Sequence, residues 1–421
     1  MRTRPRLTRL LAASVAAATA AIGLAAAPAA LAGPADSQSA GPADALGRPD
    51  MEVRFATFNA SLNRNMAGQL VTDLSTPHNA QAKAVAEIIQ RTSPDVLLVN
   101  EFDYDEGGVA ADLFRENYLE VPQNGADPVE YPYSFVAPSN TGIPSGHDLN
   151  NDGVVGGPDD AFGFGFFPGQ YGMVVYSKYP IVDDAVRTFQ HFLWKDMPGN
   201  LMPTEFYSSE EQDVLRLSSK SHWDVPVSIG KRTVHFLVSH PTPPTFDGAE
   251  DRNGRRNNDE IRFWADYIGS PARSAYIYDD DGGTGGLKPG ELFVIAGDQN
   301  SDPHDGDSVE GSIEALLNHP RINTSVTPSS EGGVEASLLQ GGANLAHEGD
   351  PAHDTADFND NPAPGNLRAD YVLPSRALRI LDAGVFWPVR ADPLSRLTGT
   401  FPFPSSDHRL VWVDVRLPHH R

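Results

Sequence analysis

Short apolar runs that end in a polar residue recur along the chain, and they constrain its fold more than any other feature. Residues 95–101 (DVLLVNE) form a continuous apolar segment of the length and kind expected of a buried strand. Two longer segments, residues 78–91 and 255–268, instead space their apolar residues as helices do. This mixture predicts one α/β domain with helices packed outside β-sheets. Further strands are predicted at residues 52–58, 173–177, 234–240, 292–298 and 409–415.

The amino-terminal segment differs from the rest of the chain. Residues 1–32 begin with four arginines, continue with an uncharged Ala/Leu-rich stretch and end in the small-residue sequence Ala30-Leu31-Ala32. This is the pattern of a cleavable signal peptide, so we expect a secreted protein with no stable membrane anchor after cleavage. An uncleaved membrane anchor is the alternative, but Gly33 and Pro34 follow at once.

The remaining sequence divides once more. Residues 33–50 are rich in Ala, Pro, Gly and Asp without periodicity, and we expect a flexible leader. Residues 51–421 contain no second linker or repeat and are predicted to form a single catalytic domain. Long Gly/Pro-rich insertions interrupt it, notably residues 139–172, and such insertions commonly build the rim of a site. No obligate protein partner is evident from the sequence.

Cysteine content and charge exclude several classes of site. The chain has no cysteine, so a disulfide, a thiolate nucleophile and a cysteine-ligated metal are ruled out. Loss of residues 1–32 removes four arginines and no acidic residue, which takes the formal net charge from −24 to −28. That field opposes passive binding of nucleic acid. It still allows an anionic substrate, because bound divalent cations can reverse the sign locally.

Most predicted strands lie next to a residue suited to metal or phosphate chemistry. For any one residue alone, a turn, a helix cap or a core histidine is the favoured interpretation. Side chains gathered at strand ends are, however, the way in which a rigid sheet positions a site. The candidates are Asn59, Glu101, His240, Asp298, Asn300, Asp370, Asp407 and His408.

In this order and with these neighbours, the candidates resemble the endonuclease/exonuclease/phosphatase superfamily, which has the deoxyribonuclease-I-like fold. The most specific parts are the GDxN sequence at residues 297–300 and the SDH sequence at residues 406–408. The resemblance covers residues 52–417. It implies a four-layer sandwich of two mainly antiparallel β-sheets flanked by helices, with a site at one edge of the two sheets that uses Mg²⁺ or Mn²⁺.

The resemblance also implies a metal-binding group. Glu101 would be the principal ligand, with Asn59 beside it, and Asp407 would complete the shell or hold a second ion. Carboxylate and amide oxygens suit a hard cation such as Mg²⁺, which keeps several waters and needs only one or two carboxylates.

The other residues would perform the chemistry. His408 is the candidate general base, with Asp370 accepting its other N–H. Asp298 and Asn300 would orient the attacking water and hold a phosphoryl oxygen. His240 would donate to the phosphate or to the leaving oxygen, where charge develops in the transition state.

The expected function is therefore that of a secreted Mg²⁺- or Mn²⁺-dependent phosphoesterase, with a phosphodiesterase or nuclease as the leading hypothesis. One alternative is a phosphomonoesterase that acts on nucleotides or inositol phosphates. Another is a phospholipid or sphingomyelin phosphodiesterase, for which residues 163–169 (GFGFFPG) are a candidate membrane contact, although we expect them to pack inside. The non-enzyme alternative is a calcium-stabilised binding protein on an inactive scaffold.

The segment after His240 is longer and more basic than a minimal nuclease would need. Arg252, Arg255 and Arg256 could contact substrate phosphate as fork-shaped donors. The alternative, which we favour slightly, is a solvated helix start whose arginines pair with neighbouring acids.

Residues 147–160 (HDLNNDGVVGGPDD) match the spacing of a calcium-binding loop. Gly153 would allow the sharp turn at position six. The ligands would be Asp148, Asn150, Asp152, the carbonyl of Val154, and Asp159 at position twelve. We expect a structural Ca²⁺ site here, and a plain Asp/Gly-rich turn is the alternative.

Overall fold

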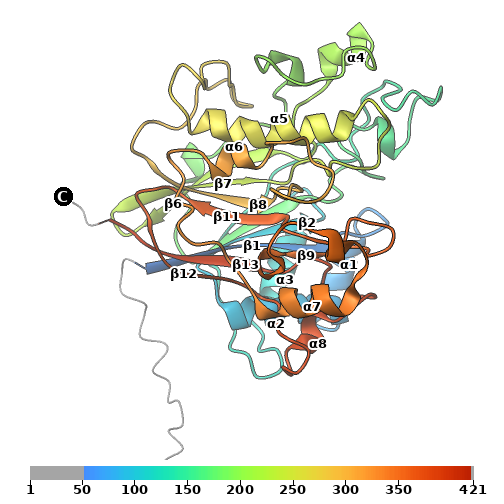
Figure 1. The fold of residues 1–421 in the computed structure, drawn as a ribbon. Coiled ribbons are helices and arrows are strands. Elements are labelled where there is room, and N and C mark those ends of the chain that lie inside the picture. Colours follow the sequence, from blue (N-terminus) through green and yellow to red (C-terminus); the bar gives the residue numbers. More distant parts are fainter. Residues whose placement is uncertain (1–51, 419–421) are drawn as a thin grey trace, which may run out of the picture. The chain divides into compact units, whose positions relative to one another are not determined.

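Two β-sheets pack face to face, and each carries helices on its outer face (Figure 1). The computed structural model describes residues 52–418. The predicted signal peptide (1–32) and leader (33–50) lie outside these residues. Each sheet contains one parallel pair of strands, and its other pairs are antiparallel. The predicted four-layer fold class is confirmed.

The strands follow the apolar runs of the sequence closely. The six-stranded sheet has the order β12-β13-β1-β2-β4-β3 and the five-stranded sheet the order β11-β8-β7-β6-β5. The first contains β1 (Glu52–Leu62), β2 (Val96–Phe102), β3 (Tyr133–Phe135), β4 (Met173–Ser177), β12 (Arg379–Val385) and β13 (Val411–Arg416). The second contains β5 (Arg187–Thr188), β6 (His222–Ile229), β7 (Arg232–Ser239), β8 (Leu292–Asp298) and β11 (Asp370–Pro374). A separate ribbon pairs β9 (Ala356–Asp357) with β10 (Asn366–Leu367).

The outer layers are helical. Apolar side chains of α2 pack on the six-stranded sheet, and those of α5 pack on the five-stranded sheet. The helix α2 begins where the Asn79 side chain accepts a hydrogen bond from the Ala82 amide, and it ends at Ser93, which has a left-handed backbone. The helices are α1 (Gln69–Leu74), α2 (Ala80–Thr92), α3 (Val109–Phe114), α4 (Ser209–Val214), α5 (Arg252–Tyr267), α6 (Glu314–Leu317), α7 (Glu331–Gln340) and α8 (Ser395–Thr398).

The central strands β2, β4 and β8 are buried on both faces, which explains why their sequences are largely apolar rather than alternating. In β1, Phe55 points into the core between the sheets, whereas Phe58 points toward the helices. In β7, Phe236 and Leu237 divide in the same way. The rings of Phe55 and Phe236 lie 5.6 Å apart between centroids and join the two sheets. Burial on both faces therefore fixes the stacking of the sheets.

The topology brings several strand ends to one edge. The parallel pairs β1–β2 and β7–β8 place their carboxyl ends together. The strand β13 is antiparallel to β1, and β11 is antiparallel to β8, so the residues that begin β13 and β11 lie at the same edge. Asp370 accordingly pairs with Asp298 across the sheet. Residues distant in sequence are thus neighbours here.

The insertion at residues 139–172 lies beside this edge. Its Gly172 and Gly169 carbonyls accept hydrogen bonds from the Phe102 and Tyr104 amides, at the carboxyl end of β2. Its aromatic segment does not pack inside as expected, because Phe164 and Phe166 are 49% and 65% exposed. The neighbouring glycines lie against backbone and supply no side chains that could cover these rings. The insertion therefore places two aromatic rings on the surface.

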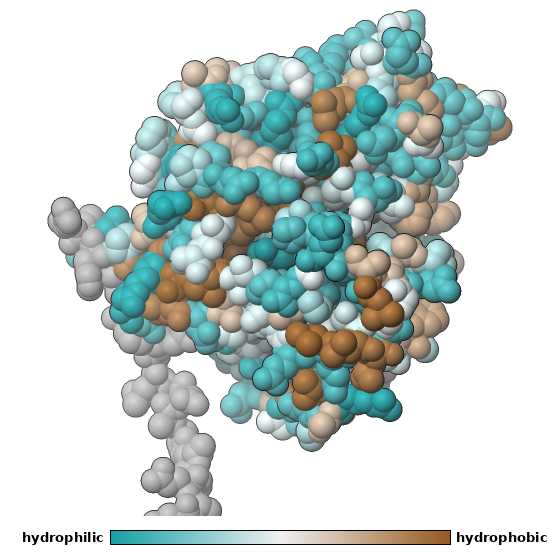
Figure 2. Space-filling view, viewed as in Figure 1, coloured by the Kyte–Doolittle hydropathy of each residue, from teal (hydrophilic) through white to brown (hydrophobic). Residues whose placement is uncertain are grey.

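Elsewhere the surface is largely hydrophilic. On the face drawn in Figure 2, apolar side chains gather over α7, where Leu338 and Leu339 are exposed. Within residues 52–418, no helix is both long enough and apolar enough to cross a membrane.

Candidate active site

One amide links the two sheets at the shared edge. Asn59 on β1 donates from Nδ2 to Glu101 Oε1 at 3.1 Å and to Asp298 Oδ2 at 3.0 Å. Glu101 is the last residue but one of β2, and Asp298 ends β8. The backbone of Glu101 has φ 56°, in the left-handed region that a residue with a side chain seldom adopts. Such strain is commonly retained where a side chain must be aimed at a site.

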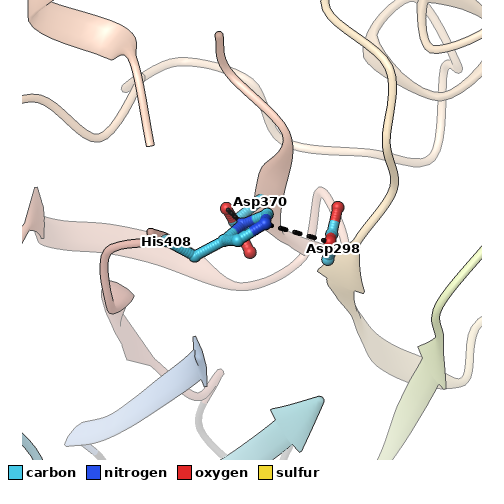
Figure 3. Close-up of side chains that lie close together, drawn as sticks. All are labelled: Asp298, Asp370 and His408. Atoms are coloured by element: carbon cyan, nitrogen blue, oxygen red, sulfur yellow. Dashed lines mark hydrogen bonds and ion pairs between the residues drawn. The ribbon is translucent and has the colours of Figure 1, made fainter. Parts of the chain in front are cut away.

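His408 lies between two buried carboxylates (Figure 3). Its Nδ1 is 2.8 Å from Asp370 Oδ2, and its Nε2 is 3.6 Å from Asp298 Oδ2. The Thr355 hydroxyl donates to the same oxygen of Asp370 at 2.8 Å, which holds that carboxylate in place. The hydrogen bond to Asp370 fixes a proton on Nδ1 and aims Nε2 at Asp298. The structure therefore places Asp370 and His408 within hydrogen-bonding distance, as the predicted pairing requires.

The charges of this group favour a protonated ring. Burial alone would lower the pKa of His408, but the carboxylates of Asp370, Asp298 and Asp407 raise it well above its usual value. Burial raises the pKa of Asp370 to about 6, against the opposing charge of His408. The pKa of Asp298 stays below its usual range, because the two histidines and Asn59 outweigh the effect of burial. A general base must be neutral, so the predicted role of His408 depends on a cation that offsets this negative field.

His240 contributes a neutral ring. Burial, followed by the charge of Lys220, lowers the pKa of His240 to about 4 despite the nearby Asp298. Its Nε2 lies 3.3 Å from Asp298 Oδ2. Its buried Nδ1 has no hydrogen-bond partner among the described residues. His240 thus contacts Asp298 here, and its predicted contact with the substrate stays a prediction.

Glu101 and Asp407 form an acidic pair whose charge is offset in part by His408. Burial and the charge of Asp407 raise the pKa of Glu101 to about 7. Neither carboxylate forms an ion pair with a side chain of residues 52–418. Asp407 Oδ1 accepts a hydrogen bond from the Ser61 hydroxyl at 3.2 Å. Oxygen ligands of like charge held together suit a hard divalent ion, so these residues fit Mg²⁺ or Mn²⁺.

A second grouping could also hold a metal. Among the described residues, Asp298, Asp370 and His408 are the group of acids and histidines whose ligand atoms lie within 4.8 Å of one another. Their charges already offset one another, however, because His408 bonds to Asp370 and faces Asp298. The Glu101–Asp407 pair forms no ion pair with a side chain of residues 52–418 and is therefore the better cation site.

Asn300 is held rigidly beside Asp298. Its amide N–H donates to Asp298 Oδ1 at 2.9 Å, and its side-chain Nδ2 donates to the Pro241 carbonyl at 3.1 Å. Its backbone φ is 50°. The GDxN sequence thus forms a turn that joins β8 to the segment after His240.

Helix α5 fastens the loops of the site with buried polar side chains, a role that the sequence analysis missed. Glu260 accepts hydrogen bonds from the Ser219 amide at 2.7 Å and the Thr242 amide at 2.6 Å. Asn257 donates to the carbonyls of Thr242 at 2.8 Å and Gln299 at 2.9 Å. The sequence does carry a sign of this role, because Asn257 and Glu260 are polar residues among the buried positions of α5.

The guanidinium of Arg256 is held by backbone carbonyls. It donates to those of Leu217 at 2.8 Å, Phe162 at 2.6 Å and Arg216 at 2.8 Å, and the residue is half-buried. These donors hold loops together, and the contact of Arg256 with substrate phosphate stays a prediction.

The other two arginines also lie apart from the strand-edge group. Arg252 pairs with Glu250, as the alternative interpretation expected. Arg255 lines a separate cavity of about 330 Å³ with Phe206 and Glu250. Neither forms an ion pair with a site carboxylate in the part of the chain that the structure describes. Contact with a long substrate remains a prediction for these two.

The predicted calcium loop closes on its own backbone. Asp148 accepts hydrogen bonds from the amides of Asp152 at 3.0 Å and Gly153 at 2.8 Å. Asn150 Oδ1 also accepts from the Asp152 amide, at 3.0 Å. Val154 is exposed. Calcium binding there stays a prediction.

The buried acid at the end of that loop is Asp160, next to the predicted ligand Asp159. Asp159 is exposed, whereas Asp160 is buried and accepts hydrogen bonds from the amides of Leu149 and Gly156, both at 2.7 Å. The short 3₁₀ turn at Pro158–Asp160 directs the second aspartate inward.

Solved structures of similar fold include an endonuclease/exonuclease/phosphatase from Beutenbergia cavernae DSM 12333, at 17% identity and a TM-score of 0.48, over 87% of this chain and 72% of that one. Truncated TDP2 from Caenorhabditis elegans is 17% identical with a TM-score of 0.40, over 87% and 98% of the two chains. Sphingomyelinase C from Streptomyces griseocarneus is 14% identical with a TM-score of 0.43, over 86% and 99%. No curated protein matches the chain.

The family resemblance predicted from the strand-end residues is confirmed independently. The model of the Endonuclease/Exonuclease/phosphatase family matches residues 56–408, which span every candidate of the strand-edge site from Asn59 to His408. The chain therefore belongs to the endonuclease/exonuclease/phosphatase family, whose members are hydrolases of phosphoester bonds.

Proposed function

We propose that the protein is a phosphodiesterase that depends on a divalent metal and hydrolyses its substrate by in-line attack of water on phosphorus. The observation that carries this proposal is the Asp370–His408–Asp298 group beside the acidic Glu101–Asp407 pair. We further propose that the protein is exported, on the sequence of residues 1–32 alone.

The residues divide the work of hydrolysis. A new P–O bond forms from water while the ester P–O bond breaks, so one proton must leave the water and one must reach the leaving oxygen. Asp298 and His408, 3.6 Å apart, offer an ionised carboxylate and an imidazole that can accept the first and supply the second. A divalent ion held by Glu101 and Asp407 would stabilise negative charge on the phosphoryl oxygens. Asn59 holds the carboxylates of Glu101 and Asp298 in fixed positions relative to each other through its two hydrogen bonds.

Charge favours a diester over a monoester. A phosphate diester carries one negative charge, whereas a monoester carries nearly two at neutral pH, since its second pKa is about 6. The formal net charge of −24 opposes the dianion more strongly.

Lipid phosphodiesters are a second candidate class of substrate, favoured by exposed Phe164 and Phe166 in the insertion beside the carboxyl end of β2.

The test is a panel of esters offered to the purified protein with Mg²⁺, Mn²⁺ or Ca²⁺. We expect a chromogenic bis-ester to be hydrolysed faster than the corresponding monoester, in Mg²⁺ or Mn²⁺. Single-stranded DNA, RNA and sphingomyelin vesicles then define the natural class. Rapid hydrolysis of the monoester with every diester left intact would replace this proposal with a phosphomonoesterase.

A further inference from the structure

Lys220 is a buried cation at the edge of the site. It lies two residues before β6, whose first residue, His222, pairs with Ser239, the residue that precedes His240. The side chain is 7% exposed. Its ammonium makes no hydrogen bond or ion pair with any of residues 52–418. That ammonium is not among the fully buried polar atoms that lack a partner in the described residues, so it keeps contact with solvent although the residue as a whole is buried.

The backbone around Lys220 is fixed on both sides. The Asn140 amide donates to the Lys220 carbonyl at 2.8 Å, and Asn140 Nδ2 donates to the Ser218 carbonyl at 2.8 Å. The Ser219 amide is held by Glu260 at 2.7 Å. The backbone position of Lys220 is therefore set by the insertion at residues 139–172 and by α5.

The charges that face Lys220 belong to the site and to α5. Glu260, Glu101 and Asp298 attract the ammonium, and Arg256 repels it. Burial lowers the pKa of Lys220, and the three carboxylates oppose that effect. The charge of Lys220 in turn helps to lower the pKa of His240. The ammonium therefore lies among the residues proposed to surround the phosphate.

A simpler interpretation makes Lys220 the counterion of buried Glu260. Both oxygens of that carboxylate already accept short hydrogen bonds, from the amides of Ser219 and Thr242. No ion pair within 4.0 Å joins Lys220 to Glu260 among the described residues. A counterion would be expected to make that contact. With Glu260 as its counterion, the three N–H donors of the Lys220 ammonium would therefore still have no acceptor among the described residues.

We propose that Lys220 is a catalytic residue whose ammonium binds a non-bridging oxygen of the substrate phosphate. The ligand class is a phosphoryl anion, and the contact would neutralise part of its negative charge. The inference rests on the proposed function for the identity of the anion. Binding of inorganic phosphate tests it without requiring turnover.

The experiment compares Lys220→Met with Lys220→Arg and with a matched control, Lys231→Met. Lys231 is exposed in the turn at the other end of the β6–β7 hairpin. In Mg²⁺ buffer, calorimetry should show inorganic phosphate binding at least about tenfold more weakly to Lys220→Met than to the wild type, and kcat/KM should fall by about 10²-fold. Lys220→Arg should recover part of both, and Lys231→Met should change neither.

A folded Lys220→Met variant that binds phosphate and turns over substrate like the wild type would overturn the proposal. Should that variant fail to fold, the wild type is modified with an amine-reactive reagent and analysed by mass spectrometry. Inorganic phosphate should then slow modification of Lys220 relative to Lys231, and an unchanged ratio contradicts the proposal. If phosphate binds through Lys220 while no ester is hydrolysed, the proposed function fails and this inference stands.

Discussion

Replacing Asp298 with Asn should lower kcat/KM by about 10²–10³-fold, a loss of about 3–4 kcal/mol of transition-state stabilisation. Asp298 Oδ2 is the atom on which Asn59, His240 and His408 converge. The amide keeps the shape of the carboxylate but removes its charge and its ability to accept a proton. His408→Gln should cause a loss of similar size, because it removes the ring that lies between the two aspartates.

These variants need a control for folding, because both residues are buried rather than exposed at the strand end. Asp224→Asn is a matched control. Asp224 is also a buried aspartate paired with a histidine, since its Oδ1 lies 2.7 Å from His235 Nδ1, but it belongs to a separate network with Tyr267. The control should keep its kcat/KM even if it loses stability. Normal turnover by Asp298→Asn would show that the role given to this residue is wrong.

Removal of divalent metal should abolish hydrolysis, and Mg²⁺ or Mn²⁺ should restore it. Glu101→Gln should raise the concentration of Mg²⁺ needed for half-maximal activity by at least about tenfold, because it removes a charged oxygen ligand. Burial and the charge of Asp407 raise the pKa of Glu101 to about 7, so this carboxylate is held in an unfavourable field when no cation is bound.

That field gives a readout other than activity. In metal-free buffer at pH 8, Glu101→Gln should be at least as thermally stable as the wild type, because the substitution removes repulsion between carboxylates. Added Mg²⁺ should raise the melting temperature of the wild type more than that of the variant. Full activity of the wild type in chelator, or an equal Mg²⁺ response of both proteins, would contradict the assignment of the metal to this pair.

The sequence predicted the edge of the sheets well because two local signals coincide there. Runs such as residues 292–298 are apolar throughout, since β8 is buried on both faces, and its predicted bounds agree with the structure. The polar residue that ends such a run stands out. Asp370 begins β11 and His408 lies just before β13, and both antiparallel strands start at the same edge, so their meeting follows from topology that the family resemblance supplied.

Long-range contacts were what the sequence could not supply. The strand β6 was missed, because Pro226 interrupts HWDVPVSI and proline is uncommon inside a central strand. The carbonyl of Pro226 accepts the Val182 amide, which completes the pairing at that point. Lys220 and Glu260 carry no local pattern, and their importance arises only from what the fold places beside them.

The most direct test of the central claim is hydrolysis of a phosphate diester in water enriched in ¹⁸O, with Mg²⁺ present, followed by mass spectrometry of both products. Attack of water on phosphorus places ¹⁸O in the phosphate-bearing product and leaves the released alcohol unlabelled. Asp298→Asn, run in parallel, should yield little of either product. Label in the alcohol would mean that the C–O bond breaks, and this result would contradict the account.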